Sequence, residues 1–231
     1  MRGKARIYGP FFRFCRSLVC LFYPPFRVLK EENIKDGAVY LLPHQNLFGP
    51  FIMLLSFPKE VRTWMLDVFL DQKTCFRQYR DYTFTKRFGM PKFVAAVIAY
   101  GASLIIPKLM RSGGGVAVYR GSKNIVKTMK ESVELLKEKQ SIVLFPNKDY
   151  TNTADDMSNL YEGFLFLEKY FYKETNKHIK FIPVYVNKKK KILVIGEAIR
   201  FRDGISFNEE RKFVLVQIQE AFRELAEKWG A

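Results

Sequence analysis

Cysteine and histidine are scarce in this chain. Its 231 residues hold three cysteines, Cys15, Cys20 and Cys75, and two histidines. The odd number of cysteines and the lack of a C-x-x-C pair argue against a disulfide framework and against a zinc-ribbon spacing. The sequence therefore predicts a protein of a reducing compartment, without a metal site.

Acidic residues are absent from the first thirty positions, where seven lysines and arginines alternate with aromatic and aliphatic side chains. Arg13 and Arg16 interrupt the apolar run and no small-residue cleavage site follows. The segment is therefore a poor signal peptide and too charged to span a bilayer. This pattern predicts that residues 1–30 form a basic, amphipathic segment lying in a membrane interface. A first helix packed on the core is the alternative.

The charge-free run Phe93 to Pro107 is short for a membrane-spanning helix. Lys92 and Lys108 bracket it, and a bilayer crossing needs ~20 apolar residues. The run therefore predicts a buried or interfacial helix that ends near Pro107.

Negative charge is also in short supply overall. Lysine and arginine number 39 against 23 acidic residues, which gives a net charge of +16 in a chain that is 48% hydrophobic and 16% aromatic. Such a balance predicts an anionic partner, either nucleic acid or an anionic membrane surface. No RNA-binding or helix-turn-helix signature accompanies it. The apolar content favours the membrane surface, with no nucleic acid.

Apolar runs of strand length alternate with helical periodicity along most of the chain. This order predicts an α/β domain over residues 31–231, with a mainly parallel sheet and helices on both faces. The run Lys188 to Lys191 is either a phosphate contact or a solvated hairpin tip. The expected strands cover residues 38–42, 61–66, 116–119, 142–145, 181–186 and 192–199, and the expected helices begin or lie within residues 51–57, 93–107, 125–136, 160–172 and 207–229.

His44 stands just past the carboxyl end of the first of these strands, after Pro43. Ligands of open α/β sheets bind at that edge, and histidine is the side chain whose pKa suits base chemistry near neutral pH. His44 is thus a candidate general base. A loop histidine without a task is the alternative.

The order of motifs around His44 resembles the glycerolipid acyltransferases of the lysophosphatidic acid acyltransferase type. That family carries His-x-x-x-x-Asp after a strand, Gly-x-x-x-x-Arg, Phe-Pro-Glu-Gly-Thr-Arg and an apolar Val/Ile-Pro-Val strand. This sequence departs from the pattern at Gly49, which replaces the motif aspartate, and at 147–150, where Asn-Lys-Asp-Tyr replaces Glu-Gly-Thr-Arg. The matching residues are His44, Gly115, Arg120, Phe145, Pro146 and Pro183.

The resemblance implies acyl transfer from acyl-CoA or acyl-carrier protein to a lysophospholipid-like or glycerol-phosphate-like acceptor, with no other cofactor. His44 would be the base, and Arg120 would bind the acceptor phosphate unless it is a strand-end arginine paired to a helix carboxylate. Asp149 would orient His44 in place of the missing aspartate. Gly115, Phe145, Pro146 and Lys148 would complete the substrate site, on the cytoplasmic face of a membrane. Loss of the aspartate leaves a catalytically silent lipid-binding homologue as the alternative.

Overall fold

The computed structural model describes residues 6–30, 34–121, 123–147 and 160–230. The chain forms two compact units. Unit 1 comprises Met1–Val19 and Arg62–Thr128, and unit 2 comprises Cys20–Val61 and Met129–Ala231. Each unit is described by itself.

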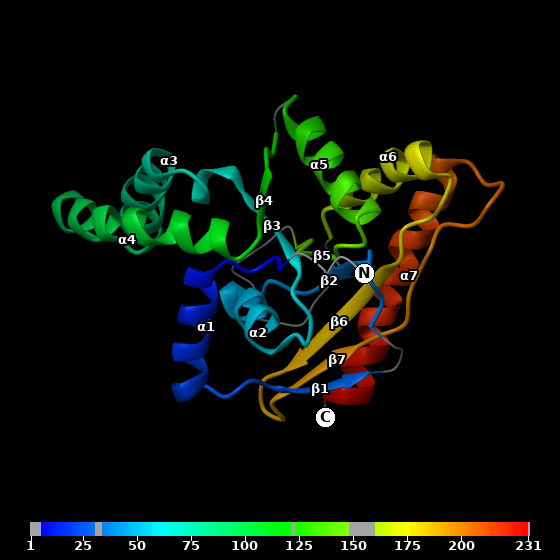
Figure 1. The fold of residues 1–231 in the computed structure, drawn as a ribbon, viewed down its shortest axis with the longest axis horizontal. Helices are drawn as coiled ribbons and strands as arrows, with labels where there is room; N and C mark the ends of the chain where they lie inside the picture. Colours follow the sequence, from blue (N-terminus) through cyan, green and yellow to red (C-terminus); the bar gives the residue numbers. More distant parts are fainter. Residues whose placement is uncertain (1–5, 31–33, 122, 148–159, 231) are drawn as a thin grey trace. The chain divides into compact units, whose positions relative to one another are not determined.

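Unit 2 contains five strands of a mostly parallel sheet (Figure 1). Strand β2 pairs in parallel with β5 on one side and β6 on the other, so that Leu41 lies opposite both Leu144 and Pro183. The exception is the antiparallel hairpin of β6 and β7, whose tip is Lys188–Lys191 with all four side chains exposed. The strands, in spatial order, are β1 (Arg27–Lys30), β7 (Ile192–Ile195), β6 (Phe181–Asn187), β2 (Val39–Leu41) and β5 (Ile142–Leu144).

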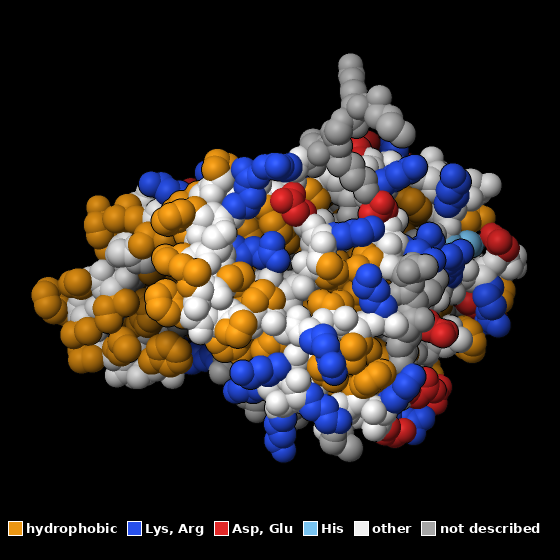
Figure 2. All heavy atoms as spheres, turned by 60° about the horizontal axis from the view of Figure 1, so that its bottom comes forward, with side chains coloured by type: hydrophobic (Ala, Val, Ile, Leu, Met, Phe, Trp, Pro, Cys, Tyr) orange, Lys and Arg blue, Asp and Glu red, His pale blue; other side chains and the backbone are white. Residues whose placement is uncertain are grey.

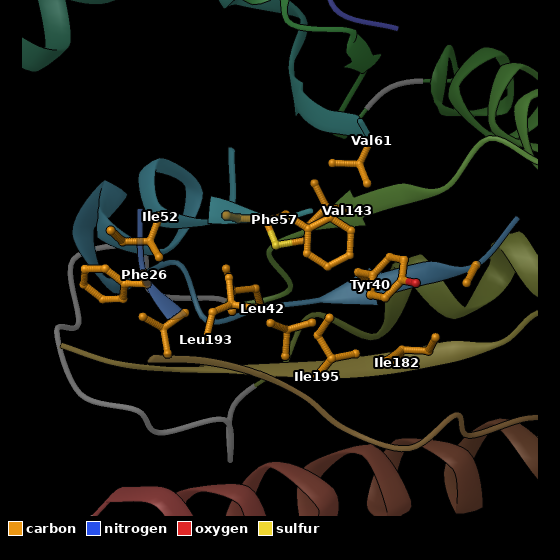
Figure 3. Close-up of a cluster of buried hydrophobic side chains, with 14 residues drawn as sticks. Phe26, Tyr40, Leu42, Ile52, Phe57, Val61, Val143, Ile182, Leu193 and Ile195 are labelled. Carbon is orange, nitrogen blue, oxygen red and sulfur yellow. The ribbon is translucent and has the colours of Figure 1, made fainter. Parts of the chain in front are cut away.

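Alternation along the strands places the main core of unit 2 on one face of this sheet. Every second residue of β6 and β7 points to helix α2 (Phe48–Ser56), as period-two geometry requires. Figure 3 shows Ile52 of α2 on this side together with Leu42 and Phe26. The buried residues on this face include Tyr40, Leu42, Ile52, Met53, Val143, Ile182, Val184, Val186, Leu193 and Ile195.

The opposite face of the same strands packs on helix α7 (Phe207–Gly230). Tyr185 and Val194, whose positions alternate with the residues of the first face, contact Leu225 of this helix. Val214, Ile218, Phe222 and Leu225 are buried along α7, as the sequence periodicity predicts. The prediction of a mainly parallel sheet with helices on both faces is confirmed for unit 2.

Unit 1 pairs β3 (Arg62–Leu66) in parallel with β4 (Gly115–Val118). Between them lie η2 (Asp67–Phe69), α3 (Gln72–Arg77), the π-helical η3 (Gln78–Arg87) and the long helix α4 (Lys92–Ser112). Apart from the N-terminal helix described below, the remaining helices of the described chain are η1 (Gln45–Leu47), α5 (Ile125–Lys137), η4 (Glu162–Leu165) and α6 (Phe166–Thr175).

Helix α4 corrects the prediction of a short helix ending near Pro107. Pro107 lies inside the helix, which continues to Ser112 and reaches 21 residues. Among the described residues it is the helix long and apolar enough to cross a membrane by length and composition. Of the two predicted alternatives, a buried or an interfacial helix, the buried one is wrong, because most of the large apolar side chains of α4 are exposed.

The N-terminal segment contributes both to packing and to the surface. Helix α1 (Pro10–Phe22) begins against the end of α4, where Phe12 N–H donates to Ser112 Oγ at 2.9 Å and Phe12 is buried. Phe14 and Phe22 of the same helix are exposed. Downstream, Phe26 joins the core of unit 2 and β1 pairs with β7. The end of residues 1–30 is therefore part of the sheet.

His178, the other histidine, lies before β6 between two carboxylates. Its Nδ1 lies 2.6 Å from Glu168 Oε1 and its Nε2 lies 3.0 Å from Asp203 Oδ1. Glu168 is 2% exposed and also accepts from the N–H of Ile179. Burial favours the neutral imidazole, but the hydrogen bonds to Glu168 and Asp203 outweigh it and raise the pKa of His178.

This raised pKa predicts a pH-dependent contribution to stability. The proton held by His178 stabilises the fold fully below about pH 6.5, its ordinary unfolded pKa, and this contribution is lost as pH rises through the raised folded pKa. His178→Gln should therefore lower the unfolding free energy by roughly 3 kcal/mol at pH 6, and by less at pH 9. Denaturant melts at both values measure the difference, and an equal loss at both would contradict the charged pair.

Candidate functional site

The carboxyl ends of β2, β5 and β6 meet at one edge of the sheet in unit 2, because the three strands are parallel. Leu42 N–H donates to Leu144 O at 3.2 Å and extends the β2–β5 ladder past its last paired residues. The loops that follow the three strands carry His44, Phe145–Asn147 and Lys188–Lys191. This edge is the place where open α/β sheets bind ligands.

His44 and the loop after β5 contact each other directly at this edge. The backbone N–H of His44 donates to Asn147 Oδ1 at 2.8 Å. The imidazole meets the Phe145 ring edge to face, with ring centroids 5.8 Å apart. The structure thus brings together His44, Phe145 and Pro146, three of the residues predicted from the sequence.

The imidazole of His44 also caps the short helix η1. Its Nδ1 accepts a hydrogen bond of 3.3 Å from the N–H of Leu47, a residue held at φ 75°. A neutral imidazole that accepts at Nδ1 carries its hydrogen on Nε2. In a Ser-His-Asp triad the base nitrogen is Nε2, and Nδ1 donates to a carboxylate. The described tautomer is therefore the opposite of the one that a triad-type base uses.

Gly49 is a packing position rather than a vacant place for an aspartate. It is the second residue of α2, and its N–H donates to His44 O at 3.2 Å. A Cβ here would overlap the carbonyl oxygen of Pro43 and lie 3.2 Å from His44 O. These are backbone atoms, so they cannot rotate away as a side chain can. The loop has closed over the position that the family's aspartate occupies.

Asn147 is a site residue that sequence reasoning passed over. It is buried, and besides holding the His44 backbone it forms an antiparallel bridge with Leu160. Pro146 O accepts from Tyr161 N–H at 2.7 Å in the same turn. Its position in the sequence could have identified it, since Asn147 stands where the motif of the resembled family has glutamate. A neutral amide there accepts from a backbone N–H without placing a buried charge beside His44.

The lysine run lies at the same edge because β6 is parallel to β2. The structure confirms the hairpin tip and adds one contact: Lys188 Nζ lies 5.2 Å from the centroid of the Phe48 ring. Phe48 is the first residue of α2, directly after the His44 loop. A lysine of the tip therefore reaches the helix that His44 precedes.

The other predicted site residues belong to unit 1 or lie outside the described residues. Arg120 and Gly115 belong to unit 1, where Arg120 follows β4 and is exposed. A Cβ on Gly115 would lie 2.6 Å from Met65 Sδ and 2.9 Å from Met110 O, so this glycine allows close packing of β4. Lys148 and Asp149 lie outside the described residues. No group of three His, Cys, Asp or Glu side chains that could hold a metal ion occurs within the part of the chain that the structure describes.

The contact at Gly49 predicts that any side chain there destabilises unit 2. Gly49→Ala should lower the unfolding free energy by about 1–3 kcal/mol, because the methyl group meets fixed backbone. The matched control is Gly101→Ala in α4, where a Cβ meets no atom within 4 Å. That change should be neutral or stabilising by about 0.5–1 kcal/mol. Thermal melts measure both, and a tolerated Gly49→Asp would show that the loop can open.

Comparison with solved structures finds a likeness in fold. The crystal structure of the 1-acyl-sn-glycerophosphate (LPA) acyltransferase, PlsC, from Thermotoga maritima matches this chain with a TM-score of 0.50 and 15% sequence identity. The match covers 95% of this chain and 79% of that chain. No protein-family model and no curated protein matches the sequence. At this identity the likeness is one of fold: the chain has the mixed α/β architecture of that acyltransferase.

Proposed function

We propose that this protein transfers an acyl group from a thioester, acyl-CoA or acyl-carrier protein, to a lysophospholipid-like or glycerol-phosphate-like acceptor. One observation carries the proposal. In a fold like that of an LPA acyltransferase, His44 and the Phe145–Asn147 loop contact each other at the ligand-binding edge of the sheet. These are the segments that match two of the motifs in the acyltransferase family.

The reaction needs a base at the moment of attack. The acceptor hydroxyl oxygen bonds to the thioester carbonyl carbon, the C–S bond breaks, His44 takes the hydroxyl proton, and the leaving thiolate receives a proton. For Nε2 to be the base, the hydrogen must move to Nδ1 and the contact with Leu47 N–H must open. Leu47 is a non-glycine residue in the left-handed region, a conformation that surrounding contacts must hold in place. Loop rearrangement on substrate binding would supply the required tautomer.

Arg120 of unit 1 and Lys188 of unit 2 are separate candidates for binding the acceptor phosphate. A guanidinium presents a planar fork that fits a phosphate, and Arg120 keeps the Gly-x-x-x-x-Arg spacing from Gly115. Lys188 comes from the tip at the His44 edge and adds a mobile point charge. Lys148 and Asp149 stay proposals from the sequence alone.

A lysophospholipid acceptor resides in a membrane, so the proposed place of the reaction is a membrane surface. The N-terminal segment would rest on the cytoplasmic face of an anionic membrane, with Arg13 and Arg16 near the headgroups. Exposed Phe14 and Leu21 of α1 supply apolar side chains for this contact.

A second candidate is a lipid-binding protein without turnover. The filled position at Gly49 and the Nδ1 contact of His44 favour it, because no side chain fits at position 49 and the Leu47 contact selects the tautomer opposite to that of a triad-type base. This candidate keeps the lysolipid site and loses the chemical step.

Acyl transfer by the purified protein separates the two candidates. With labelled acyl-CoA and a panel of lysolipids, we expect transfer by the wild type and a fall of about 10²–10⁴-fold in His44→Ala, the usual contribution of a general base. His178→Gln is the matched control, since the second histidine precedes β6 and so lies toward the opposite edge. An unchanged rate of acyl transfer in His44→Ala would contradict the role of His44 as the general base. Lysolipid binding with no transfer would establish the second candidate.

Arg120→Ala should weaken phosphate-bearing acceptors far more than acceptors without phosphate. A lost charge-assisted contact costs about 1.5–3 kcal/mol, or roughly ten- to a hundredfold in kcat/KM. Arg223→Ala on α7 is the control, because Arg223 is an exposed arginine that pairs with Glu220 on its own helix. Equal losses for both acceptor types, with a lowered melting temperature, would make Arg120 structural.

A further inference from the structure

Helix α4 presents an uncharged apolar face to solvent. Phe93 is 80% exposed, Val97 61% and Ile105 56%, and positions on this face recur every three or four residues. From Phe93 to Ile105 the face extends over about 18 Å of helix axis. Lys92 precedes it, and Lys108 and Arg111 follow it. The exposed apolar side chains of α4 are Phe93, Val94, Val97, Ile98, Tyr100, Leu104 and Ile105.

The other face of α4 is covered by polar neighbours. Its buried residues are small and recur every four positions: Ala95, Ala99, Ser103 and Pro107. Helix α3 and η3 pack on the helix. Both neighbours carry charged side chains, among them the ion pair of Arg80 with Asp81 at 2.6 Å. A bilayer crossing by α4 would draw these charges into hydrocarbon, which is costly. The arrangement suits a helix lying in one leaflet.

Positive charge is concentrated in the same unit. Unit 1 holds 17 lysines and arginines and 3 acidic residues, so it carries +14 of the chain's net charge of +16. Unit 2, with more residues, carries the remaining +2. Figure 2 shows hydrophobic side chains gathered in the region that α4 occupies in Figure 1, with lysines and arginines on neighbouring surface. An apolar face within a strongly basic unit complements the surface of an anionic bilayer.

We propose that the exposed face of α4 inserts into the acyl region of an anionic membrane leaflet, parallel to the surface, while Lys92, Lys108 and Arg111 bind lipid headgroups. This surface is additional to the proposed contact of the N-terminal segment. Vesicle binding tests it without any acyl transfer, so its failure is distinguishable from failure of the proposed reaction.

Vesicle binding of charged variants is the first test. Wild type should sediment with vesicles of phosphatidylcholine and phosphatidylglycerol in equal parts, and weaker binding is expected with pure phosphatidylcholine or in high salt. Val97→Glu with Ile105→Glu should lower the partition coefficient by about tenfold or more, because carboxylates would enter the acyl region. Val216→Glu is the matched control, since Val216 is a 56% exposed valine on α7 in unit 2. It should bind as wild type does.

Depth of insertion is the second test, which does not depend on charged variants folding. The variant Val97→Trp places a tryptophan on the exposed face of α4. Vesicles of lipids with brominated acyl chains should quench the fluorescence of this tryptophan, and they should not quench that of Val216→Trp. Equal vesicle binding by all variants, or no quenching at position 97, would overturn the proposal. So would a wild type that sediments as a dimer without vesicles while Val97→Glu with Ile105→Glu is monomeric and still binds vesicles. That result would assign the face to a second copy of the chain.

Discussion

The parallel pairing of β2 with β5 and β6 is the constraint on which the described site depends. Parallel strands end at the same edge, so residues 100 or more apart in the sequence meet there. His44 comes after β2, Asn147 after β5 and Lys188 after β6. The hydrogen bond of 2.8 Å from His44 N–H to Asn147 Oδ1 fixes the loops relative to each other. A buried core on both faces of the sheet holds the strands, so the position of the histidine is set by the packing beneath it.

The same loop limits the chemistry that His44 can perform. Gly49, the second residue of α2, lies so close to Pro43 that no side chain fits between them. There is therefore no room at this position for the side chain of an orienting carboxylate. Nδ1 of the imidazole accepts a hydrogen bond from the backbone N–H of Leu47. A backbone N–H donates to Nδ1, whereas a carboxylate accepts from it, and the two partners select opposite tautomers. A triad-type base at His44 would thus need a second loop conformation, whereas lipid binding without turnover would not.

Much of the fold could be predicted from the sequence because its signals are local. Alternation in residues 181–186 and the helical stripe from Val214 to Leu225 report directly on burial. The charge-free run misled the prediction of the helix length, because the run stops at Pro107, whereas this proline is buried inside α4 and the helix continues to Ser112. The left-handed conformation of Leu47 and the closure over Gly49 depend on tertiary packing, so no pattern of residue types reveals them. The sequence pattern predicts one membrane-interface segment over residues 1–30. Phe26 near its end packs in the core of unit 2 against residues far along the chain, a contact that local sequence does not reveal.

Burial and charge assign different physical tasks to the two units. Unit 2 has the large core, the edge at which the parallel strands β2, β5 and β6 end, and almost balanced charge, which suits a rigid support for a reaction site. Unit 1 has nearly all the net charge and an apolar helix face that its own packing leaves exposed. Exposing that face to water is unfavourable. Helix α3 and η3 do not cover it, because they pack on the opposite face of α4, where Ala95, Ala99 and Ser103 are buried. The proposed lysolipid acceptor would offer a reason for this cost, since a protein that takes its substrate from a bilayer must hold itself at the bilayer surface. Under that proposal, the nearly balanced charge of unit 2 would confine electrostatic attraction to anionic lipid to unit 1, which carries the apolar face.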